Sequence, residues 1–198
     1  MLTKIKLCGL FQKADIVYAN QAQPDFVGFV FVKTSRRYVS FQQAVTLRKK
    51  LDWCIPVVGV FVNEPLINIQ KAFKAGIIQY AQLQGQESEK FVNQLQTNGI
   101  PVIRAVSAGQ LPFKSQAEYL LIDGPKAGSG QTFSWSTVVR PDQAFFLAGG
   151  ITLTNVLQAI KELSPNVIDV SSGIETRGVK DRQKMISIVR KVHYAKNN

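Results

Sequence analysis

The chain has 198 residues, of which 45% are hydrophobic and 19% are charged. This balance is typical of a globular protein with a sizeable core and excludes a disordered or fibrous chain. No apolar run approaches the roughly 20 residues that a membrane helix requires, so we expect no membrane partner. The N-terminus lacks the apolar core of a signal peptide, and two cysteines are too few for a disulfide framework. Both features predict a cytoplasmic protein.

The net charge is +11, from 24 Lys and Arg against 13 Asp and Glu. The basic residues lie in short scattered groups, such as Arg36-Arg37 and Arg48-Lys49-Lys50, without a nucleic-acid-binding motif. A basic protein can bind nucleic acid, but scattered charge is more typical of a solvated surface or of attraction for a small anion. We therefore expect a small anionic ligand and no nucleic acid.

Short β-prone runs alternate with helical patterns along the chain. Eight strands are predicted, in chain order, at Ile5–Cys8, Phe26–Val32, Val57–Val62, Gln79–Leu83, Pro101–Val106, Tyr119–Asp123, Ala144–Ala148 and Val167–Val170. Helices are predicted between and after them, around residues 14–18 and at Ser40–Leu51, Leu66–Phe73, Glu87–Thr97, Phe133–Val139, Leu153–Ile160 and Asp181–Tyr194. The segment Ser107–Gln116 contains Gly109 and Pro112 and is a poor helix.

Local signals predict several helix ends and faces. Ser40 and Gln43 have the spacing of a capping box. Asn63 is predicted to cap a helix that carries Pro65 in its first turn. In the seventh unit, the spacing of four apolar residues predicts one buried helix face, made of Leu153, Val156, Leu157 and Ile160.

Strict alternation of strands and helices indicates a parallel sheet. A doubly wound open sheet is one arrangement of such units, but eight regular units in 198 residues favour a small closed barrel. We therefore predict an α/β fold, a single-domain (β/α)8 TIM barrel that spans residues 1–198. In such barrels the chemistry lies at the carboxyl ends of the strands, which reduces the titratable residues to a short list.

Two turns late in the chain are candidates for binding a phosphate group. Gly149 and Gly150 follow the seventh strand and carry no side chains, so a ligand can approach the backbone closely. Ser171-Ser172-Gly173 follows the eighth strand and is also small and polar. Backbone N–H groups and a helix start suit an anion, and a (β/α)8 barrel commonly keeps its phosphate site after strands seven and eight.

Few residues remain for acid–base chemistry. The only histidine, His193, lies on the last helix, and no Cys-x-x-Cys pair or cofactor motif exists, so we expect neither a metal nor a cofactor. Cys8, which ends strand one, is either a small buried hydrophobe or a thiol base whose pKa is lowered by its position. Asp123, which ends strand six, is either a turn cap or a general acid with a raised pKa.

Other polar residues lie near the same strand ends. Asp169, inside strand eight, either orients a substrate or pairs with a nearby cation. Adjacent arginines are usually surface charges, but Arg37, after strand two, is placed to clamp a carboxylate. The Gly128-Ser129-Gly130 loop follows strand six, where it can close over a ligand. Together these residues favour isomerisation or elimination on a phosphorylated sugar.

Nearly the whole chain resembles the phosphoribosylanthranilate isomerase family of tryptophan biosynthesis. The resemblance lies in an ordered series of motifs: Lys6-Leu7-Cys8-Gly9-Leu10, Gly28-Phe29-Val30-Phe31, Ser35-Arg36-Arg37-Tyr38, Val58-Gly59-Val60-Phe61-Val62-Asn63, Gln82-Leu83-Gln84-Gly85, Gly128-Ser129-Gly130 with Phe133 and Trp135, Leu147-Ala148-Gly149-Gly150 with Asn155-Val156, Asp169-Val170-Ser171-Ser172-Gly173-Ile174-Glu175, Gly178 and Lys180-Asp181. Each motif alone is weak, whereas their order and spacing together are highly specific.

The resemblance implies an Amadori rearrangement of N-(5′-phosphoribosyl)anthranilate to 1-(2-carboxyphenylamino)-1-deoxyribulose 5-phosphate, so the expected partner is a small phosphoribosyl substrate. In the family, an aspartic acid protonates the ribose ring oxygen and a cysteine thiolate removes the C2′ proton. These roles correspond to Asp123 and Cys8. Arg37 is then expected to face the anthranilate carboxylate, and the phosphate to lie on N–H groups of Gly149–Gly150 and Ser171–Gly173.

Four residues depart from the usual family pattern. Phe11 stands where threonine is usual, Gln84 where histidine is usual, Ala127 where glycine is usual, and Ser134 where aspartate is common. None of the four is the inferred acid or base, so these changes bear on turnover rate and substrate contacts.

Two other functions fit parts of the pattern. The bifunctional sugar isomerases of histidine and tryptophan synthesis use paired aspartates at the ends of strands one and six, and Cys8 argues against this mechanism. A basic binding protein without catalysis would bind polyanions, and the presence of both Cys8 and Asp123 argues against it. The pattern is compatible with a monomer or a homodimer.

Overall fold

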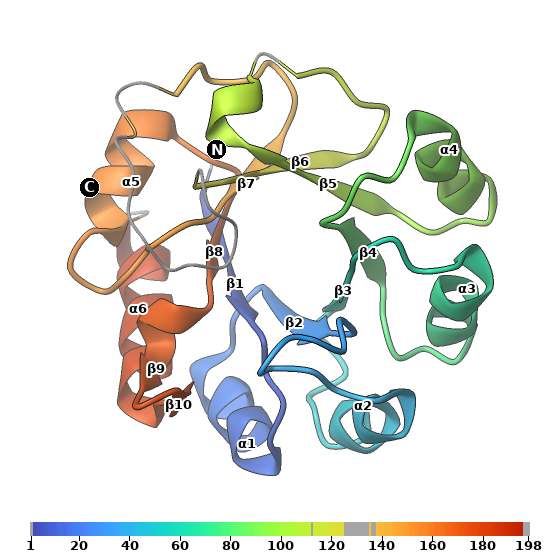
Figure 1. Ribbon diagram of the computed structural model, residues 1–198. Helices are drawn as coiled ribbons and strands as arrows, with labels where there is room; N and C mark the ends of the chain where they lie inside the picture. The colour runs from blue at the N-terminus through green and yellow to red at the C-terminus, as the bar shows by residue number, and fades with distance from the viewer. Residues whose placement is uncertain (1, 112, 125–134, 136–137, 196–198) are drawn as a thin grey trace.

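The computed structural model describes residues 2–111, 113–124, 135 and 138–195. Within them, eight parallel strands close into a barrel in chain order, and helices surround it (Figure 1). The strands are β1 (Lys4–Cys8), β2 (Phe26–Val30), β3 (Val57–Phe61), β4 (Tyr80–Leu83), β5 (Val102–Ser107), β6 (Tyr119–Asp123), β7 (Phe145–Leu147) and β8 (Val167–Val170). The predicted (β/α)8 barrel is confirmed.

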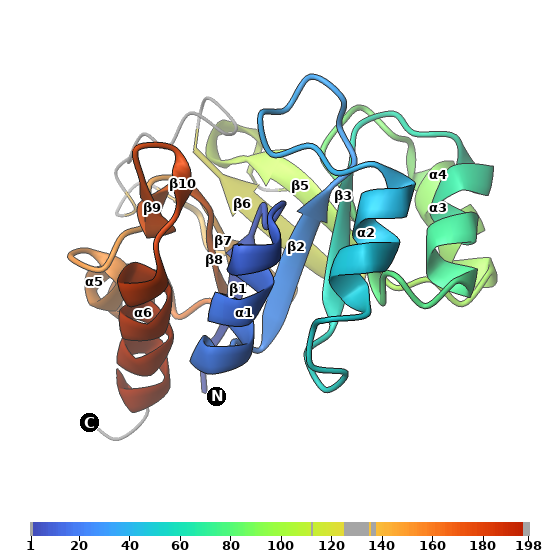
Figure 2. The ribbon, with the colours of Figure 1, turned by 90° about the horizontal axis from the view of Figure 1, so that it is seen from below.

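The helices pack their apolar faces against the outside of the barrel. They are α1 (Lys13–Ala22), α2 (Phe41–Arg48), α3 (Leu66–Lys74), α4 (Glu89–Thr97), α5 (Val156–Leu163) and α6 (Arg182–Tyr194). An antiparallel hairpin, β9 (Glu175–Thr176) with β10 (Val179–Lys180), joins β8 to α6. In Figure 2 the strands rise toward the end of the barrel beside which this hairpin lies.

The barrel interior is filled in layers because alternate residues of each strand point inward. At the amino-terminal end the filling is aromatic: the Phe146 ring lies 5.7 Å from Phe26 and 5.3 Å from Tyr119, and Phe26 lies 5.6 Å from Tyr80. These rings close the lower end of the barrel. Two residues further along β1, β4 and β8, the inward side chains become polar.

The local helix predictions had mixed outcomes. The capping box is confirmed, because the Ser40 side chain accepts from the Gln43 backbone and the Gln43 side chain accepts from the Ser40 backbone. The predicted cap at Asn63 is wrong: α3 begins after Pro65. Asn63 instead adopts a left-handed backbone with φ of 49°, and its side chain accepts a hydrogen bond from Gln86 at 3.0 Å.

The predicted face of the seventh helix is also partly wrong. Helix α5 begins at Val156, so Leu153 lies in the turn before it, and Leu157 is 43% exposed. The buried face consists of Val156, Ala159 and Leu163. Leu153 and Ile160 flank this face, because both are partly buried and pack against the core as predicted, so Leu157 is the one predicted position that is exposed.

Two connections after β5 and β6 differ from regular helices. Only a short 3-10 turn, η1 (Ala108–Gln110), follows β5, which confirms that this segment is a poor helix. The predicted helix at Phe133–Val139 and the Gly128–Gly130 loop lie largely or wholly outside the described residues. Among the helices of the described chain, none combines the length and apolarity needed to cross a bilayer.

Truncation of the aromatic layer is expected to destabilise the barrel. Phe146 is fully buried, so Phe146→Ala leaves a cavity that its neighbours can fill only partly. We expect the free energy of unfolding, measured by urea denaturation, to fall by about 3–5 kcal/mol. Trp53→Ala is the control, because Trp53 is 83% exposed. Equal losses in the two variants would contradict the layered interior.

Candidate active site

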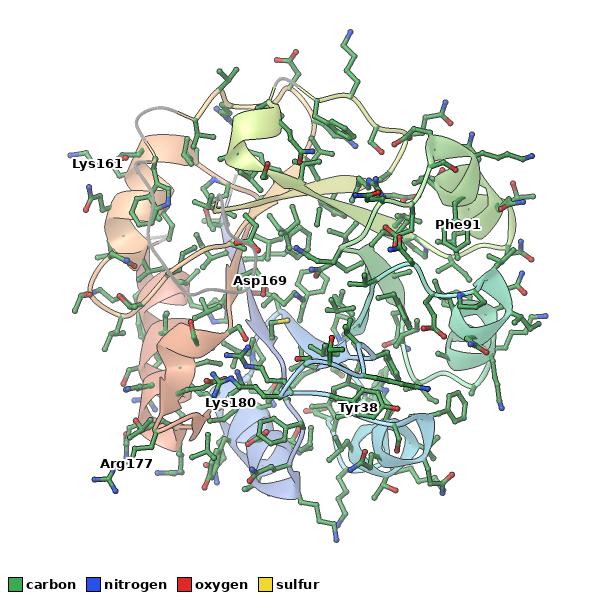
Figure 3. The ribbon with its side chains drawn as sticks, in the orientation of Figure 1. Tyr38, Phe91, Lys161, Asp169, Arg177 and Lys180 are labelled. Carbon is green, nitrogen blue, oxygen red and sulfur yellow. The ribbon has the colours of Figure 1, made fainter. Side chains whose placement is uncertain are left out.

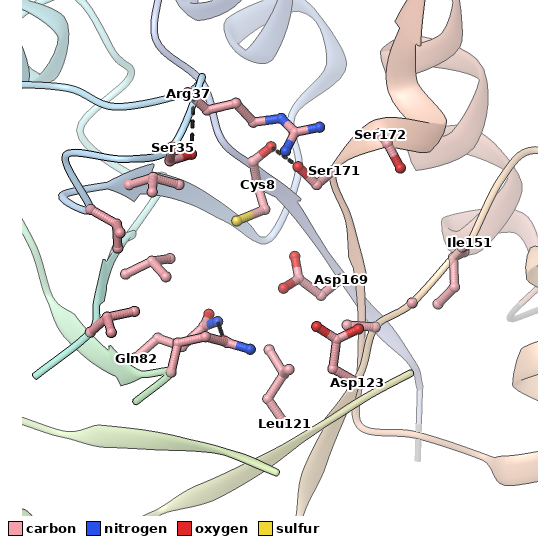
Figure 4. Close-up of a pocket in the computed structure, with 18 residues that line it drawn as sticks. Cys8, Ser35, Arg37, Gln82, Leu121, Asp123, Ile151, Asp169, Ser171 and Ser172 are labelled. Atoms are coloured by element: carbon pink, nitrogen blue, oxygen red, sulfur yellow. Dashed lines mark hydrogen bonds between the residues drawn. The ribbon is translucent and has the colours of Figure 1, made fainter. Parts of the chain in front are cut away.

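A cavity of about 310 Å³ opens at the carboxyl ends of the strands (Figure 4). Its wall combines aliphatic side chains with polar groups and backbone turns. The lining residues are Cys8, Val30, Val32, Ser35, Arg37, Val60, Val62, Gln82, Gln84, Leu121, Asp123, Ala148, Gly149, Gly150, Ile151, Asp169, Ser171 and Ser172. Residues from the first to the eighth strand therefore meet in one space.

All but one of the site residues predicted from the sequence line this cavity. The exception is Gly173, which is not part of the wall. A Cβ atom on Gly173 would overlap the carbonyl oxygen of Ile151. Glycine is thus required here for close packing, because it lets the turn after β8 lie against the loop after β7.

Cys8 points into the cavity from the end of β1 (Figure 4) and is 8% exposed. Its sulfur lies over Gly28, where an added Cβ would be 2.7 Å from Sγ. Burial raises the pKa of the Cys8 thiol, and the nearby Lys6 ammonium only partly opposes this effect. The expectation of a lowered thiol pKa is therefore wrong, because the surrounding strands remove the thiol from water.

Beneath Cys8, the floor of the cavity is made of Gln82 and Asp169, and a buried lysine joins these two residues. Lys6 is fully buried, and its ammonium donates to Asp169 Oδ2 at 2.8 Å and to Gln82 Oε1 at 2.9 Å. Gln82 Nε2 in turn donates to Gln84 Oε1 at 2.7 Å. Gln84, which stands where the family usually has histidine, thus ends a hydrogen-bonded chain across the barrel from β8 to β4.

The ion pair keeps this floor electrically neutral. Burial alone would lower the pKa of Lys6, but the charge and hydrogen bond of Asp169 together with those of Cys8 outweigh it and the net pKa is raised, so Lys6 stays charged. The other Asp169 oxygen, Oδ1, is buried and has no hydrogen-bond partner among the described residues. Figure 3 shows Asp169 inside the ring of strands, and Figure 4 shows its carboxylate facing the cavity. Both sequence interpretations of Asp169 are therefore compatible with its position.

Asp123 ends β6 and also faces the cavity (Figure 4). Its Oδ1 accepts a hydrogen bond from the Gly124 backbone at 2.8 Å, which is the turn contact expected of a capping residue. The Asp123 carboxyl group therefore serves the turn and also forms part of the cavity wall.

Arg37 reaches the cavity rim from the loop after β2. The Glu175 carboxylate holds it side-on, with Nε–Oε1 at 2.7 Å and Nη2–Oε2 at 3.2 Å. Arg36 and Lys180 also contact Glu175. Three cations thus surround one carboxylate, and the excess of positive charge beside the cavity favours an anionic ligand.

The two phosphate-binding turns predicted from the sequence lie side by side on the wall. Gly149 and Gly150 have φ of 91° and 64°, which glycine adopts without strain. Asn155 stabilises this turn by donating to the Gly150 carbonyl at 3.0 Å and accepting from the Thr152 backbone at 2.8 Å. Helix α5 begins six residues after Gly150, so the positive end of its dipole lies in the same connection.

Sequence analysis assigned no role to four polar residues that build the site: Lys6, Gln82, Glu175 and Lys180. Lys6 had a usable signal, because a lysine two residues before Cys8 in a strand must share its inward face. Glu175 and Lys180 had no such signal, because nothing in the neighbouring sequence indicates that they contact Arg37. Among the described residues, no group of three His, Cys, Asp or Glu side chains is placed to hold a metal ion.

Comparisons with known proteins agree on one family. A family model described as N-(5′-phosphoribosyl)anthranilate isomerase matches residues 5–191. The N-(5′-phosphoribosyl)anthranilate isomerase of Lactiplantibacillus plantarum is 40% identical over 194 residues, covering 97% of this chain and 93% of that protein.

Solved structures give the same result. The crystal structure of TrpF from Jonesia denitrificans superposes with a TM-score of 0.87 at 34% identity and covers 98% of both chains. A phosphoribosylanthranilate isomerase in complex with reduced 1-(o-carboxyphenylamino)-1-deoxyribulose 5-phosphate has a TM-score of 0.79 at 27% identity. The match covers 96% of this chain and 98% of that one.

Removal of the buried ammonium is expected to be costly. Lys6→Met leaves the Asp169 carboxylate buried without its cation, and we expect the free energy of unfolding to fall by about 3–5 kcal/mol in urea titrations. The double variant Lys6→Met/Asp169→Leu removes both charges and is expected to recover most of the loss. A double variant as unstable as Lys6→Met would show that the ion pair is not the cause.

Glu175 is expected to make stability depend on acid pH. Burial raises its pKa, but hydrogen bonds from Arg37 and Lys180 outweigh burial and bring the pKa from 4.5 to about 2. The folded state thus gains stability above pH 4.5 and loses it as pH falls toward about 2. Urea titrations should show Glu175→Gln less stable than wild type at neutral pH, with the difference shrinking over that window. Glu64→Gln, on the surface before α3, serves as control, and a pH-independent difference would contradict this account.

Proposed function

Because this chain belongs to the N-(5′-phosphoribosyl)anthranilate isomerase family, whose members are isomerases of tryptophan biosynthesis, we propose that it rearranges N-(5′-phosphoribosyl)anthranilate to 1-(2-carboxyphenylamino)-1-deoxyribulose 5-phosphate. The observation that carries the proposal is the meeting of Cys8, Asp123, Arg37 and two phosphate-type turns in one cavity. These are the groups that a substrate with a sugar, an aromatic carboxylate and a phosphate requires.

The reaction needs an acid and a base on one sugar. Protonation of the ribose ring oxygen by Asp123 breaks the bond between that oxygen and C1′, which opens the ring to a Schiff base. The Cys8 thiolate then takes the proton from C2′, and the electron pair moves toward the iminium nitrogen to give an enolamine. Tautomerisation of the enolamine yields the ketone, with no net change in oxidation or atoms.

The floor of the cavity suits this use of Cys8. A buried thiol has a raised pKa, so a nearby cation is needed to increase the thiolate fraction. Lys6 provides one, and both its Cε and the sulfur of Cys8 pack against Gly28, at 3.2 Å and 2.7 Å from an added Cβ. A thiol with a pKa above the working pH is also a strong base once ionised.

The two anionic groups of the substrate match two groups of residues on the rim. The phosphate is placed on the backbone of Gly149–Gly150 and of Ser171–Ser172, where N–H groups and the start of α5 favour an anion. The anthranilate carboxylate is placed at the Arg37 guanidinium, which binds planar carboxylates through paired hydrogen bonds. The aliphatic side chains of the cavity wall, which include Val30 and Val62, suit the aromatic ring.

No feature of the site favours the alternative functions. A sugar isomerase with paired aspartates would need a carboxylate at the end of β1, where Cys8 stands. The charged rim borders a cavity of about 310 Å³, which fits a small molecule better than a polyanion.

The proposal is tested by following the loss of anthranilate-type fluorescence while phosphoribosylanthranilate is generated in situ. Cys8→Ser and Asp123→Asn are each expected to lower kcat by about 100- to 10,000-fold, the usual contribution of a general acid or base. Cys54→Ser is the matched control, because Cys54 is an exposed cysteine outside the cavity. The proposal fails if wild type does not exceed the spontaneous background, or if both catalytic variants retain its rate.

A further inference from the structure

The β9–β10 hairpin brings two buried charges to the cavity rim. Glu175 and Lys180 face each other across the hairpin register, and they are only 8% and 4% exposed. Arg177, at the turn of the same hairpin, points outward into solvent (Figure 3). Charged side chains are rarely buried unless they are paired, so the inward pair needs a structural or functional reason.

The Glu175 carboxylate determines how Arg37 is oriented. It takes one N–H from Nε and one from Nη2, which leaves the other three of the five guanidinium donors for a ligand. The Arg37 side chain is 12% exposed and lies over Gly9, where an added Cβ would overlap Cδ. Glu175 therefore holds one edge of the guanidinium. Gly9 leaves room for the Arg37 side chain because it has no Cβ atom.

Lys180 connects this pair to the neighbouring turn after β8. Its ammonium donates to Glu175 Oε1 at 2.9 Å and to the Ser171 carbonyl at 2.9 Å. The Ser171 hydroxyl in turn donates to the Cys8 carbonyl at 3.2 Å. One cluster thus joins the loop after β2, the turn after β8 and the end of β1.

Arg36 provides an internal comparison. It contacts the same Glu175 carboxylate, but its side chain is 54% exposed and does not line the cavity. Two arginines therefore share one carboxylate, and only Arg37 has donors facing the ligand site.

We propose that Glu175 is a positioning residue for substrate recognition: it orients the Arg37 guanidinium toward the aromatic carboxylate, and Lys180 holds that guanidinium in register with the phosphate-binding turn at Ser171. This inference rests on the proposed function, because the carboxylate and the phosphate are those of its substrate. An unrestrained arginine has many rotamers, so fixing it beforehand lowers the cost of binding.

The test separates positioning from a purely structural role by comparing two ligands. The first is reduced 1-(2-carboxyphenylamino)-1-deoxyribulose 5-phosphate, and the second is the same compound without its ring carboxyl group. Their Kd values are measured by titration calorimetry. Glu175→Gln, which keeps the shape but has a single acceptor oxygen, is expected to weaken the carboxylated ligand by about 10- to 100-fold and the second ligand by less than about threefold.

Two comparisons sharpen the result. Arg36→Ala, which removes the exposed partner of the same carboxylate, is expected to change either Kd by less than about threefold. In an Arg37→Ala background, Glu175→Gln is expected to add no selective loss, because Glu175 acts through Arg37. If Glu175→Gln does not fold, as judged by circular dichroism, Glu175→Asp replaces it: it keeps the charge but is one methylene too short to hold both guanidinium groups.

The outcomes distinguish the inference from the function on which it rests. Equal weakening of both ligands, or a selective loss that persists without Arg37, would overturn the positioning role while the proposed function stands. If wild type binds neither ligand, the proposed function itself fails and the inference fails with it.

Discussion

The ion pair between Lys6 and Asp169 lies between β1 and β8, the first and last strands, whose pairing closes the barrel. The two residues are Cα partners in the β1–β8 ladder, although 163 positions separate them in the chain. Each charge would be costly alone in this interior, and together they cancel. The pair separates the aromatic layer below from the cavity above, so one interaction links the two strands that close the barrel to the floor of the site.

The cavity combines a neutral floor with a cationic rim. In the floor, the charge of Lys6 is matched by Asp169, so the paired Lys6 ammonium opposes the raised pKa of the Cys8 thiol only in part. At the rim, Glu175 balances only part of its basic partners, and the remaining positive charge faces the ligand. The neutral floor and the cationic rim are thus separate layers of the same cavity.

Local sequence determined the architecture and the end of the barrel at which chemistry occurs. Alternating strand and helix periods predicted the closed barrel, and the spacing of Ser40 and Gln43 predicted the capping box of α2. Parallel strands all end at one side of a barrel, so the residues that end them, such as Cys8 and Asp123, were predicted to lie at one end from connectivity alone. These features depend on backbone geometry within a few residues, which the order of side chains encodes directly.

Tertiary structure decided burial, partners and ionisation. The raised pKa of Cys8 follows from strands that surround it, and the orientation of Arg37 follows from Glu175, 138 positions away. Tertiary structure also decided the role of Asn63, because its side chain accepts a hydrogen bond from the loop after β4 instead of capping α3. The sequence by itself determined the fold and the strand ends that carry the candidate acid and base. Only the closed barrel decided which charges meet, because pairing and desolvation arise between residues that are distant in the chain.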